Sequence, residues 1–404
     1  MPLPTPQTLL PLLARITAWI MTLDLSKNYI PKADDCNVKT GSGCYSIFIN
    51  GNLARVLLAS YKITGDASHL QEGLRWCDTF VASQHSGLSG DGKDVVGWWD
   101  TGYDELYIAD TGTAVTTLAV CYDLLQSQDP RRFTYMSALQ KFDRFVRRGI
   151  NKTPQCTPIL PGKKSCSYDG NGSETSNGWI AGAGAGDDAG GVGDGYYMGR
   201  LNMPPYTIST ALSGGVFYAE MYALANASAA ERSTYASISH GAVGWLLRKK
   251  YANGTIPYII MPPTSEPHEY QSITYSAEAF VDLHLRFGAA ATPMLRELAK
   301  TINFLLSKQG PSGALLPNGT SGEIYRSARA TSLMQWWYMN VEPSNEKLAQ
   351  AISRYVVDWL QSDEGAAKEG VASKALPSGF IGLVVADLIQ PWATFVKGTW
   401  PTKL

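Results

Sequence analysis

The chain has 404 residues and a formal net charge of −1, with no basic stretch, which excludes nucleic acid as an expected partner. The longest apolar stretch near the start, Leu9 to Met21, is interrupted by Arg15 and is too short to span a bilayer, so no membrane partner is expected. No charge block, Pro/Ser tract or change of composition marks a linker. We therefore expect a single domain over residues 1–404.

Helical segments follow one another along the whole chain. The first, Thr8 to Leu23, predicts a helix without a partner next to it. Six further apolar segments follow, each after a long loop, and they begin near Asn50, Asp110, Thr207, Gln271, Ser327 and Leu376. After each of the first five, a tight turn leads to a second helical segment; these turns are Thr64–Asp66, Ser127–Asp129, Ala227–Ala229, Gly288–Ala290 and Val341–Pro343.

The two helices of each predicted hairpin differ in composition and in hydrophobic pattern. The first are rich in small residues and nearly uncharged, as in residues 111–115 and 378–382, which is typical of helices buried on every side. The second are amphipathic; in one of them Leu139, Phe142 and Val146 recur at helical spacing between charged residues. Strand signals are weak, and only Ile256 to Met261 suggests a short strand. The pattern predicts an all-α (α/α)6 double toroid, closed by the N-terminal helix.

All the long loops of such a ring lie on one face, where the inner helices begin. They span about 24–49, 85–109, 150–206, 251–270, 310–326 and 362–375. Loops of this length in a compact domain are usually functional. Helix N-termini carry partial positive charge and free N–H groups, so a pocket there should favour an anion.

Sequons and cysteines indicate a secreted protein. Asn-X-Ser/Thr sequons occur in predicted loops or turns at Asn151, Asn171, Asn226, Asn253 and Asn318. Two pairs of cysteines each flank one loop and could close short disulfides, Cys36 with Cys44 and Cys156 with Cys166. Cys77 and Cys121 lie on apolar helix faces, and we expect them to be buried thiols. No cysteine or histidine spacing suggests zinc, and no cofactor is expected.

The hairpin from Ala59 to Asp66, continued by Leu70 and Trp76, resembles those of (α/α)-toroid carbohydrate-active enzymes. That group includes alginate and glucuronan lyases, unsaturated-glucuronyl hydrolases, α-mannanases and the helical domain of glucuronyl C5-epimerases. The alginate-lyase signature Asn-Asn-His-Ser-Tyr-Trp is absent, so the resemblance points to the group and not to one family. It implies a polysaccharide or oligosaccharide substrate bound across the mouth of the ring and stacked on aromatic residues.

One candidate site lies where the fourth inner helix begins. β-Elimination at a uronate needs a base for the C5 proton, an acid for the leaving oxygen and a group that neutralises the carboxylate. His268, Tyr270 and Tyr275 could share the first two roles. In the next hairpin, Tyr325 could bind substrate and Arg326 could neutralise the carboxylate. The plainer alternative is a loop histidine bonded to backbone and a packed Tyr275.

A competing candidate is the acidic, aromatic segment 98–110. Glycoside hydrolysis needs two carboxyl groups flanking the scissile bond, and Asp104 or Asp110 could pair with Glu278 across the ring. An Asp before Thr-Gly at a helix start is also an ordinary N-cap, which is the simpler role for Asp110. Trp98 and Trp99 are candidate sugar platforms.

The third loop is dense in glycine from Gly182 to Gly195 and predicts a flexible lid over the cleft. A phosphate loop would need a Lys-Ser/Thr or a preceding strand, which this segment lacks. Its aspartates lack the spacing of an EF-hand. Three residues just after it are candidates for substrate contact when the lid closes: Tyr196, Tyr197 and Arg200. Tyr206, which leads into the third inner helix, is a further candidate for substrate binding.

These features predict a secreted, monomeric lyase that cleaves a uronic-acid polymer such as glucuronan or alginate, with Tyr/His acid–base catalysis and an anionic substrate. Two alternatives share the ring: a glycoside hydrolase that uses paired carboxylates, and a C5-epimerase that uses the same first step as the lyase. A non-catalytic glycan-binding protein is a third possibility.

Overall fold

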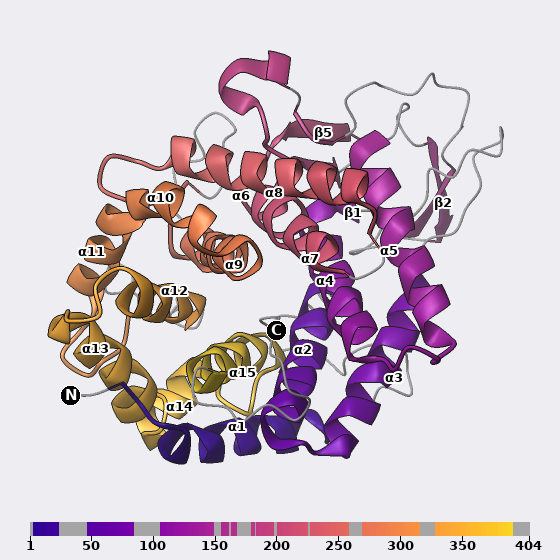
Figure 1. The fold of residues 1–404 in the computed structure, drawn as a ribbon. Coiled ribbons are helices and arrows are strands. Elements are labelled where there is room, and N and C mark those ends of the chain that lie inside the picture. The colour runs from indigo at the N-terminus through magenta and orange to yellow at the C-terminus, as the bar shows by residue number, and fades with distance from the viewer. Residues whose placement is uncertain are drawn as a thin grey trace.

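The computed structural model describes residues 3–23, 47–84, 106–148, 155–160, 163–167, 179–181, 183–197, 200–224, 227–257, 269–315 and 328–390. The described helices form two concentric rings (Figure 1). The inner ring consists of α2 (Ile47–Thr64), α4 (Ile108–Leu124), the continuous run of α6 (Thr207–Ser209), the π-helical η3 (Thr210–Val216) and α7 (Phe217–Ala223), then α9 (Glu269–Phe287), α12 (Ala328–Asn340) and α15 (Ala375–Ile389).

The outer ring covers these helices. It consists of α1 (Pro6–Ile20), α3 (Ala67–Ser83), α5 (Arg131–Arg148), α8 (Ala229–Lys249), a broken run made of η4 (Gly288–Ala290), α10 (Thr292–Leu295), η5 (Arg296–Leu298) and α11 (Ala299–Lys308), and finally α13 (Glu346–Ser353), which continues into the π-helical η7 (Arg354–Trp359). The short helix α14 (Asp363–Glu369) lies between η7 and α15, inside a segment predicted to be loop.

The ring closes as the sequence predicts. Each inner helix contacts the next, and α15 contacts α2. The N-terminal helix α1 packs against both α15 and α2, which completes the sixth hairpin (Figure 1). A hydrogen bond from Gln361 Nε2 to the Thr8 carbonyl (2.9 Å) joins the ends of this circle. The (α/α)6 toroid is therefore confirmed.

Local chemistry explains the tight turns. Gly65 adopts a positive φ of 77°, and Asp66 caps α3 by accepting a hydrogen bond from the Ser68 N–H (2.9 Å). A capping box starts α8, in which Ser228 and Glu231 each bond the other's backbone N–H.

Small residues allow the inner helices to approach closely. A Cβ on Gly112 would lie 2.3 Å from the Ser213 Oγ, so no larger residue fits between α4 and η3. The Ser213 hydroxyl donates to the Ile108 carbonyl (2.6 Å), and the Thr117 hydroxyl donates to the Gly51 carbonyl (3.1 Å). Each of the first five inner helices is followed by an outer helix that packs beside it and returns the chain, so the inner helices begin at the same end of the ring. We call this end the mouth.

The structure also contains strands that the sequence did not indicate. Strands β1 (Leu106–Tyr107), β4 (Gly193–Tyr197) and β5 (Arg200–Pro205) form an antiparallel sheet in the order β1-β4-β5, and β2 (Gln155–Leu160) pairs with β3 (Lys163–Ser167). Their residues alternate poorly, and β1 pairs with a strand far along the chain. The expected strand at Ile256 is wrong for the two residues described, since Ile256 and Pro257 are in no strand.

The described part of the glycine-rich third loop is fastened, which argues against a flexible lid. Its 3₁₀ segment, η2 (Ala183–Asp188), is held to α8 by an ion pair between Lys249 and Asp188 (3.0 Å). Arg248 donates to the Ala189 carbonyl (2.5 Å). At the end of the segment, the Val192 N–H donates to the Thr210 hydroxyl of the inner ring (2.8 Å).

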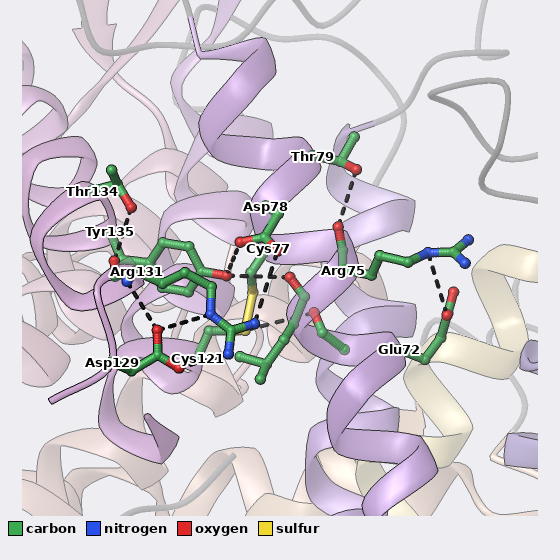
Figure 2. Close-up of polar contacts among 12 residues, drawn as sticks. Glu72, Arg75, Cys77, Asp78, Thr79, Cys121, Asp129, Arg131, Thr134 and Tyr135 are labelled. Atoms are coloured by element: carbon green, nitrogen blue, oxygen red, sulfur yellow. Dashed lines mark hydrogen bonds and ion pairs between the residues drawn. A yellow bond between two sulfur atoms is a disulfide. The ribbon is translucent and has the colours of Figure 1, made fainter. Parts of the chain in front are cut away.

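The prediction of buried thiols at Cys77 and Cys121 is wrong in one respect. Both residues are buried, but they form a disulfide that joins α3 to α4 (Figure 2). Beside it, the Tyr135 hydroxyl of α5 donates to Asp78 (2.5 Å), so polar contacts and a covalent bond both fasten this hairpin to its neighbour (Figure 2).

The other expected disulfides stay predictions. The register of β2 and β3 places Cys156 opposite Cys166, as a bridge requires, while Cys36 and Cys44 lie outside the described residues. Among the described helices, none combines the length and the apolar character needed to cross a membrane.

Candidate active site at the mouth of the ring

Three aromatic rings meet near the mouth, one from each of three inner helices. Phe48 of α2, Tyr275 of α9 and Phe380 of α15 have ring centroids 5.5 Å (Phe48–Tyr275), 5.9 Å (Tyr275–Phe380) and 5.7 Å (Phe48–Phe380) apart. All three lie within the first two turns of their helices and are buried. We call them the aromatic cluster. Packing around the ring edges fixes the position of the Tyr275 phenol.

Deeper along the axis, four charged side chains form the axial ion-pair chain. Arg55 of α2 pairs with one oxygen of Glu278 on α9, and Arg329 of α12 pairs with the other (3.0 Å). Arg329 also pairs with Asp387 of α15 (2.9 Å), which accepts a further hydrogen bond from the Ser332 hydroxyl (2.7 Å). The four residues are buried and their formal charges cancel, which is how a protein interior tolerates such groups.

The axial ion-pair chain lies next to the aromatic cluster on helix α9. Tyr275 and Glu278 are three residues apart on α9, so their side chains are neighbours on one face. Asp282 follows on the same face and is also buried. Burial alone would lower the pKa of Arg329, but the charges of Glu278, Asp387 and Asp282 outweigh it and hold that pKa above its usual value. The charge of the Arg329 guanidinium is therefore permanent at any working pH.

A second charged group lies at the opposite end of the axis, near the tight turns. Arg286 of α9 forms a buried ion pair with Glu220 of α7. Desolvation lowers the pKa of Lys62, near the end of α2, to about 8, although Asp123 and Glu220 oppose this effect. The axis is thus polar along much of its length, while the contacts between neighbouring inner helices are apolar or made by small residues.

Among the predicted site residues, the structure describes the side chains of three. Tyr275 is in the aromatic cluster and Glu278 in the axial ion-pair chain. Tyr206 is buried at the N-cap of α6, where its N–H donates to the Val192 carbonyl (2.9 Å). No described contact brings Tyr206 to the other two.

The remaining candidates are placed by backbone only, or not at all. Tyr270 is the second residue of α9, while Tyr197 and Arg200 face each other across the β4–β5 hairpin. The other candidates lie outside the described residues: Trp98, Trp99, Asp104, His268, Tyr325 and Arg326.

Asp110 and Glu278, the two described carboxylates of the competing site, have different surroundings. Asp110 is the third residue of α4, inside its first turn and half-buried, so it is not the N-cap that the sequence suggested. The two guanidiniums that hold Glu278 leave it poorly suited to exchange protons with a substrate. The structure therefore gives different surroundings to Asp110 and Glu278, which the sequence analysis offered as the two members of one carboxylate pair.

The sequence reasoning missed Arg55 and Asp387, although the chain carries a signal for both. Inner helices carry few charges, yet a charged residue follows an aromatic one after seven positions in three of them: Phe48 with Arg55, Tyr275 with Asp282, and Phe380 with Asp387. Seven residues are two helical turns, so each pair lies on one face. A lone charge on an otherwise apolar buried helix is expected to find a partner.

Comparisons with known proteins agree with this architecture. No protein-family model matches the sequence, and a search of curated proteins finds no match. Solved structures match at 11% sequence identity: a glycosyl hydrolase of family 88 from Bacteroides vulgatus (TM-score 0.60, covering 96% of this chain and 99% of that one) and a polysaccharide lyase (TM-score 0.56, 95% and 99%). An inactive variant of the GH76A α-1,6-mannanase of Salegentibacter sp. HEL1_6, in complex with α-1,6-mannotriose, also matches at 11% identity (TM-score 0.56, 94% and 98%). This chain has the (α/α)6-toroid fold of these carbohydrate-active enzymes.

Proposed function

We propose that this chain is an enzyme that cleaves a uronic-acid polysaccharide by β-elimination at the mouth of the ring. The observation that carries the proposal is the placement of Tyr275: a phenol held by two other aromatic rings at the start of the inner helices, one turn above Glu278 and its two guanidiniums. A tyrosine can act as general base or acid, and the mouth of such a ring offers helix N-termini to an anionic substrate.

The reaction assigns a role to each candidate group. A base removes the C5 proton, the electrons form the C4–C5 double bond, and the bond from C4 to the leaving oxygen breaks while an acid protonates that oxygen. Tyr275 shares these two roles with Tyr270 and His268, which stand at and just before the start of α9 in the chain. Arg326 stands two residues before α12, the neighbour of α9 in the ring, and neutralises the uronate carboxylate.

The same geometry weighs against a hydrolase that would use Glu278. Hydrolysis requires one carboxyl group able to donate a proton and a second one able to act as base or nucleophile. The two oxygens of Glu278 face two guanidiniums, one from Arg55 and one from Arg329, so both oxygens are engaged by protein side chains. A buried, doubly paired carboxylate supports its neighbours better than it serves a sugar.

A second candidate function rests on Asp110. This carboxylate lies half-buried in the first turn of α4, at the mouth, and could act with Asp104 from the preceding segment in a glycoside hydrolase. The structurally similar proteins include hydrolases as well as a lyase, which keeps this reading open as an outcome of the test.

We also propose that the protein is secreted. The disulfide between Cys77 and Cys121 supports this proposal, because disulfides persist in oxidising compartments. Extracellular polysaccharide would then be within reach of the enzyme.

The test is an assay for the ultraviolet absorbance of the conjugated, unsaturated uronate during incubation with glucuronan or alginate. The lyase proposal predicts a rise that Tyr275→Phe abolishes and Asp110→Asn leaves in place. New reducing ends without that absorbance, lost in Asp110→Asn, would replace the lyase by the hydrolase. Exchange of the C5 hydrogen with solvent, without cleavage, would indicate the epimerase.

A further inference from the structure

The turn that follows α8 presents an exposed aromatic ring beside a sequon. Tyr251 is 53% exposed, one of the few large hydrophobic side chains on the described surface with that much exposure. Two residues later comes Asn253, also exposed, in the sequon Asn253-Gly254-Thr255. An exposed ring leaves apolar area in contact with water, which costs free energy unless a ligand covers it.

Backbone contacts hold this turn in one conformation. The Tyr251 N–H donates to the Thr255 carbonyl (2.8 Å), and the Gly254 N–H donates to the Tyr251 carbonyl (2.9 Å). Gly254 has a φ of +96°, and a Cβ there would lie 2.4 Å from the carbonyl carbon of Lys300 on α11. The Thr301 hydroxyl donates to the Gly254 carbonyl (2.6 Å), so the turn is fastened to the outer ring.

The sequon side chains are arranged within the same turn. The carboxamide oxygen of Asn253 accepts hydrogen bonds from the Thr255 N–H (3.0 Å) and from the Thr255 hydroxyl (2.7 Å). Thr255 itself is buried, whereas Asn253 is exposed. The oxygen is thereby held toward the protein, and the Nδ2 amide donates to no described residue. It is the part of this side chain that remains for a covalent modification.

We propose that Asn253 carries an N-linked glycan whose first sugar stacks on the ring of Tyr251. In the covalent step, Nδ2 forms a bond to the anomeric carbon of a lipid-linked diphospho-oligosaccharide, the bond from that carbon to the diphosphate oxygen breaks, and Nδ2 loses one proton. The apolar face of the sugar covers the exposed ring, as sugars and aromatic side chains pack through their apolar surfaces. Because the backbone of the turn is already held by hydrogen bonds, no backbone ordering is needed when the sugar docks.

The stacking distinguishes this site from a sequon that is merely accessible. A glycan on an unstructured loop leaves the folded state unchanged, whereas a glycan that covers Tyr251 is bound more favourably in the folded chain than in the unfolded one. It therefore stabilises the fold through linkage. The glycan can be attached only if the protein passes through a secretory pathway, and the experiment supplies that passage with an added secretion signal. The test of the glycan is therefore independent of the proposed enzyme activity.

The first experiment expresses the full chain with that signal in a eukaryotic host and measures the peptide that contains Asn253 by mass spectrometry. We expect a glycan that peptide-N-glycosidase removes and that Asn253→Gln lacks. An unmodified peptide in a secreted, folded protein overturns the proposal.

The second experiment compares melting temperatures before and after enzymatic trimming of the glycan. In the original protein and in Tyr251→Phe, the glycan should raise the melting temperature by roughly 1–3 °C. In Tyr251→Ala, the glycan should leave the melting temperature unchanged. Phe133→Ala is the matched control, since Phe133 is an exposed ring (82%) on α5 with no sequon beside it, and it should leave the effect of the glycan intact. Equal shifts with Tyr251 and with Tyr251→Ala overturn the stacking.

Discussion

Arg55 and Glu278 form an ion pair across the axis of the inner ring, between helices α2 and α9, which stand on opposite sides of it. Both side chains are buried below the aromatic cluster: Glu278 lies one turn after Tyr275 on α9, and Arg55 lies two turns after Phe48 on α2. These buried charged side chains form a polar floor below the mouth of the ring. Arg329 and Asp387 extend this floor to α12 and α15, so that four of the six inner helices are joined by charge.

Glu278→Gln should destabilise the fold strongly. The substitution keeps the shape of the side chain but leaves Arg55 and Arg329 buried with one carboxylate between them, and loss of one partner from a buried pair typically costs about 3–5 kcal/mol. Unfolding by urea, followed by circular dichroism, measures the effect. Glu364→Gln is the control, because its partner Lys368 is exposed and such surface pairs contribute little. Equal urea midpoints for the two variants would contradict the structural role of the axial ion-pair chain.

Tyr275→Phe should separate catalysis from stability. The variant keeps the ring contacts with Phe48 and Phe380 and loses only the hydroxyl, so the urea midpoint should change little. The rate of unsaturated-product formation should fall by about 10²–10⁴-fold, the usual contribution of one general acid or base. Tyr355→Phe is the matched control, because its buried hydroxyl lies in the outer ring and has no hydrogen-bond partner among the described residues. A normal rate in Tyr275→Phe would remove Tyr275 from the mechanism.

The ring could be predicted from the sequence because its signals are local. The six predicted starts fall within three residues of the observed ones; the largest difference is Asn50 against the observed start of α2 at Ile47. Apolar runs and turn residues such as Gly65 act over a few positions, and the closed topology then follows from pairing the unpaired ends. Strand β4 could not be found this way, because it pairs with β1, some ninety residues earlier in the chain.

The site was only partly predictable for a related reason. Tyr275 was found from its place at the start of an inner helix, which the helical period gives. The roles of Glu278 and Arg329 could not be predicted. In a sequence, a free carboxylate looks the same as one that is paired with guanidiniums from two other helices. Pairing of Arg55 with Glu278 depends on which helices stand opposite in the finished ring. Asp110 shows the converse: its position at the mouth was right, while its expected N-cap role was not.

Loss of the Cys77–Cys121 disulfide should cost stability without unfolding the ring. The bond closes a loop of 44 residues, for which the chain-entropy model gives about 4 kcal/mol. Replacement of both cysteines by alanine should therefore lower the urea midpoint clearly, while the helical circular-dichroism signal in buffer is retained. Because both sulfurs are fully buried, a mild thiol reductant should leave the native bond intact and reduce it only in denaturant. Rapid reduction of the native protein would show that α3 opens locally.

Glu369→Gln should change how stability depends on pH. Glu369 is buried beside η7, where its Oε1 accepts a hydrogen bond from the Trp359 indole (2.7 Å), and burial raises its pKa to about 8. The carboxyl is therefore mostly neutral in the folded chain at pH 7, while in the unfolded chain it ionises near the ordinary glutamate pKa of 4.5. Between these values the folded state holds one more proton than the unfolded state.

The sign follows from linkage. Where the folded state binds more protons, the free energy of unfolding falls as the pH rises, here by about 1.4 kcal/mol per pH unit, and the fall ends near the folded pKa. Urea midpoints measured at intervals across the window from 4.5 to about 8 should decline less steeply in Glu369→Gln than in the original protein, since the amide cannot ionise. All other titrating groups are common to both chains, so the difference between the two curves isolates Glu369. Parallel curves would mean that this carboxyl is ionised when folded, and that a cation or water reaches it beside Trp359.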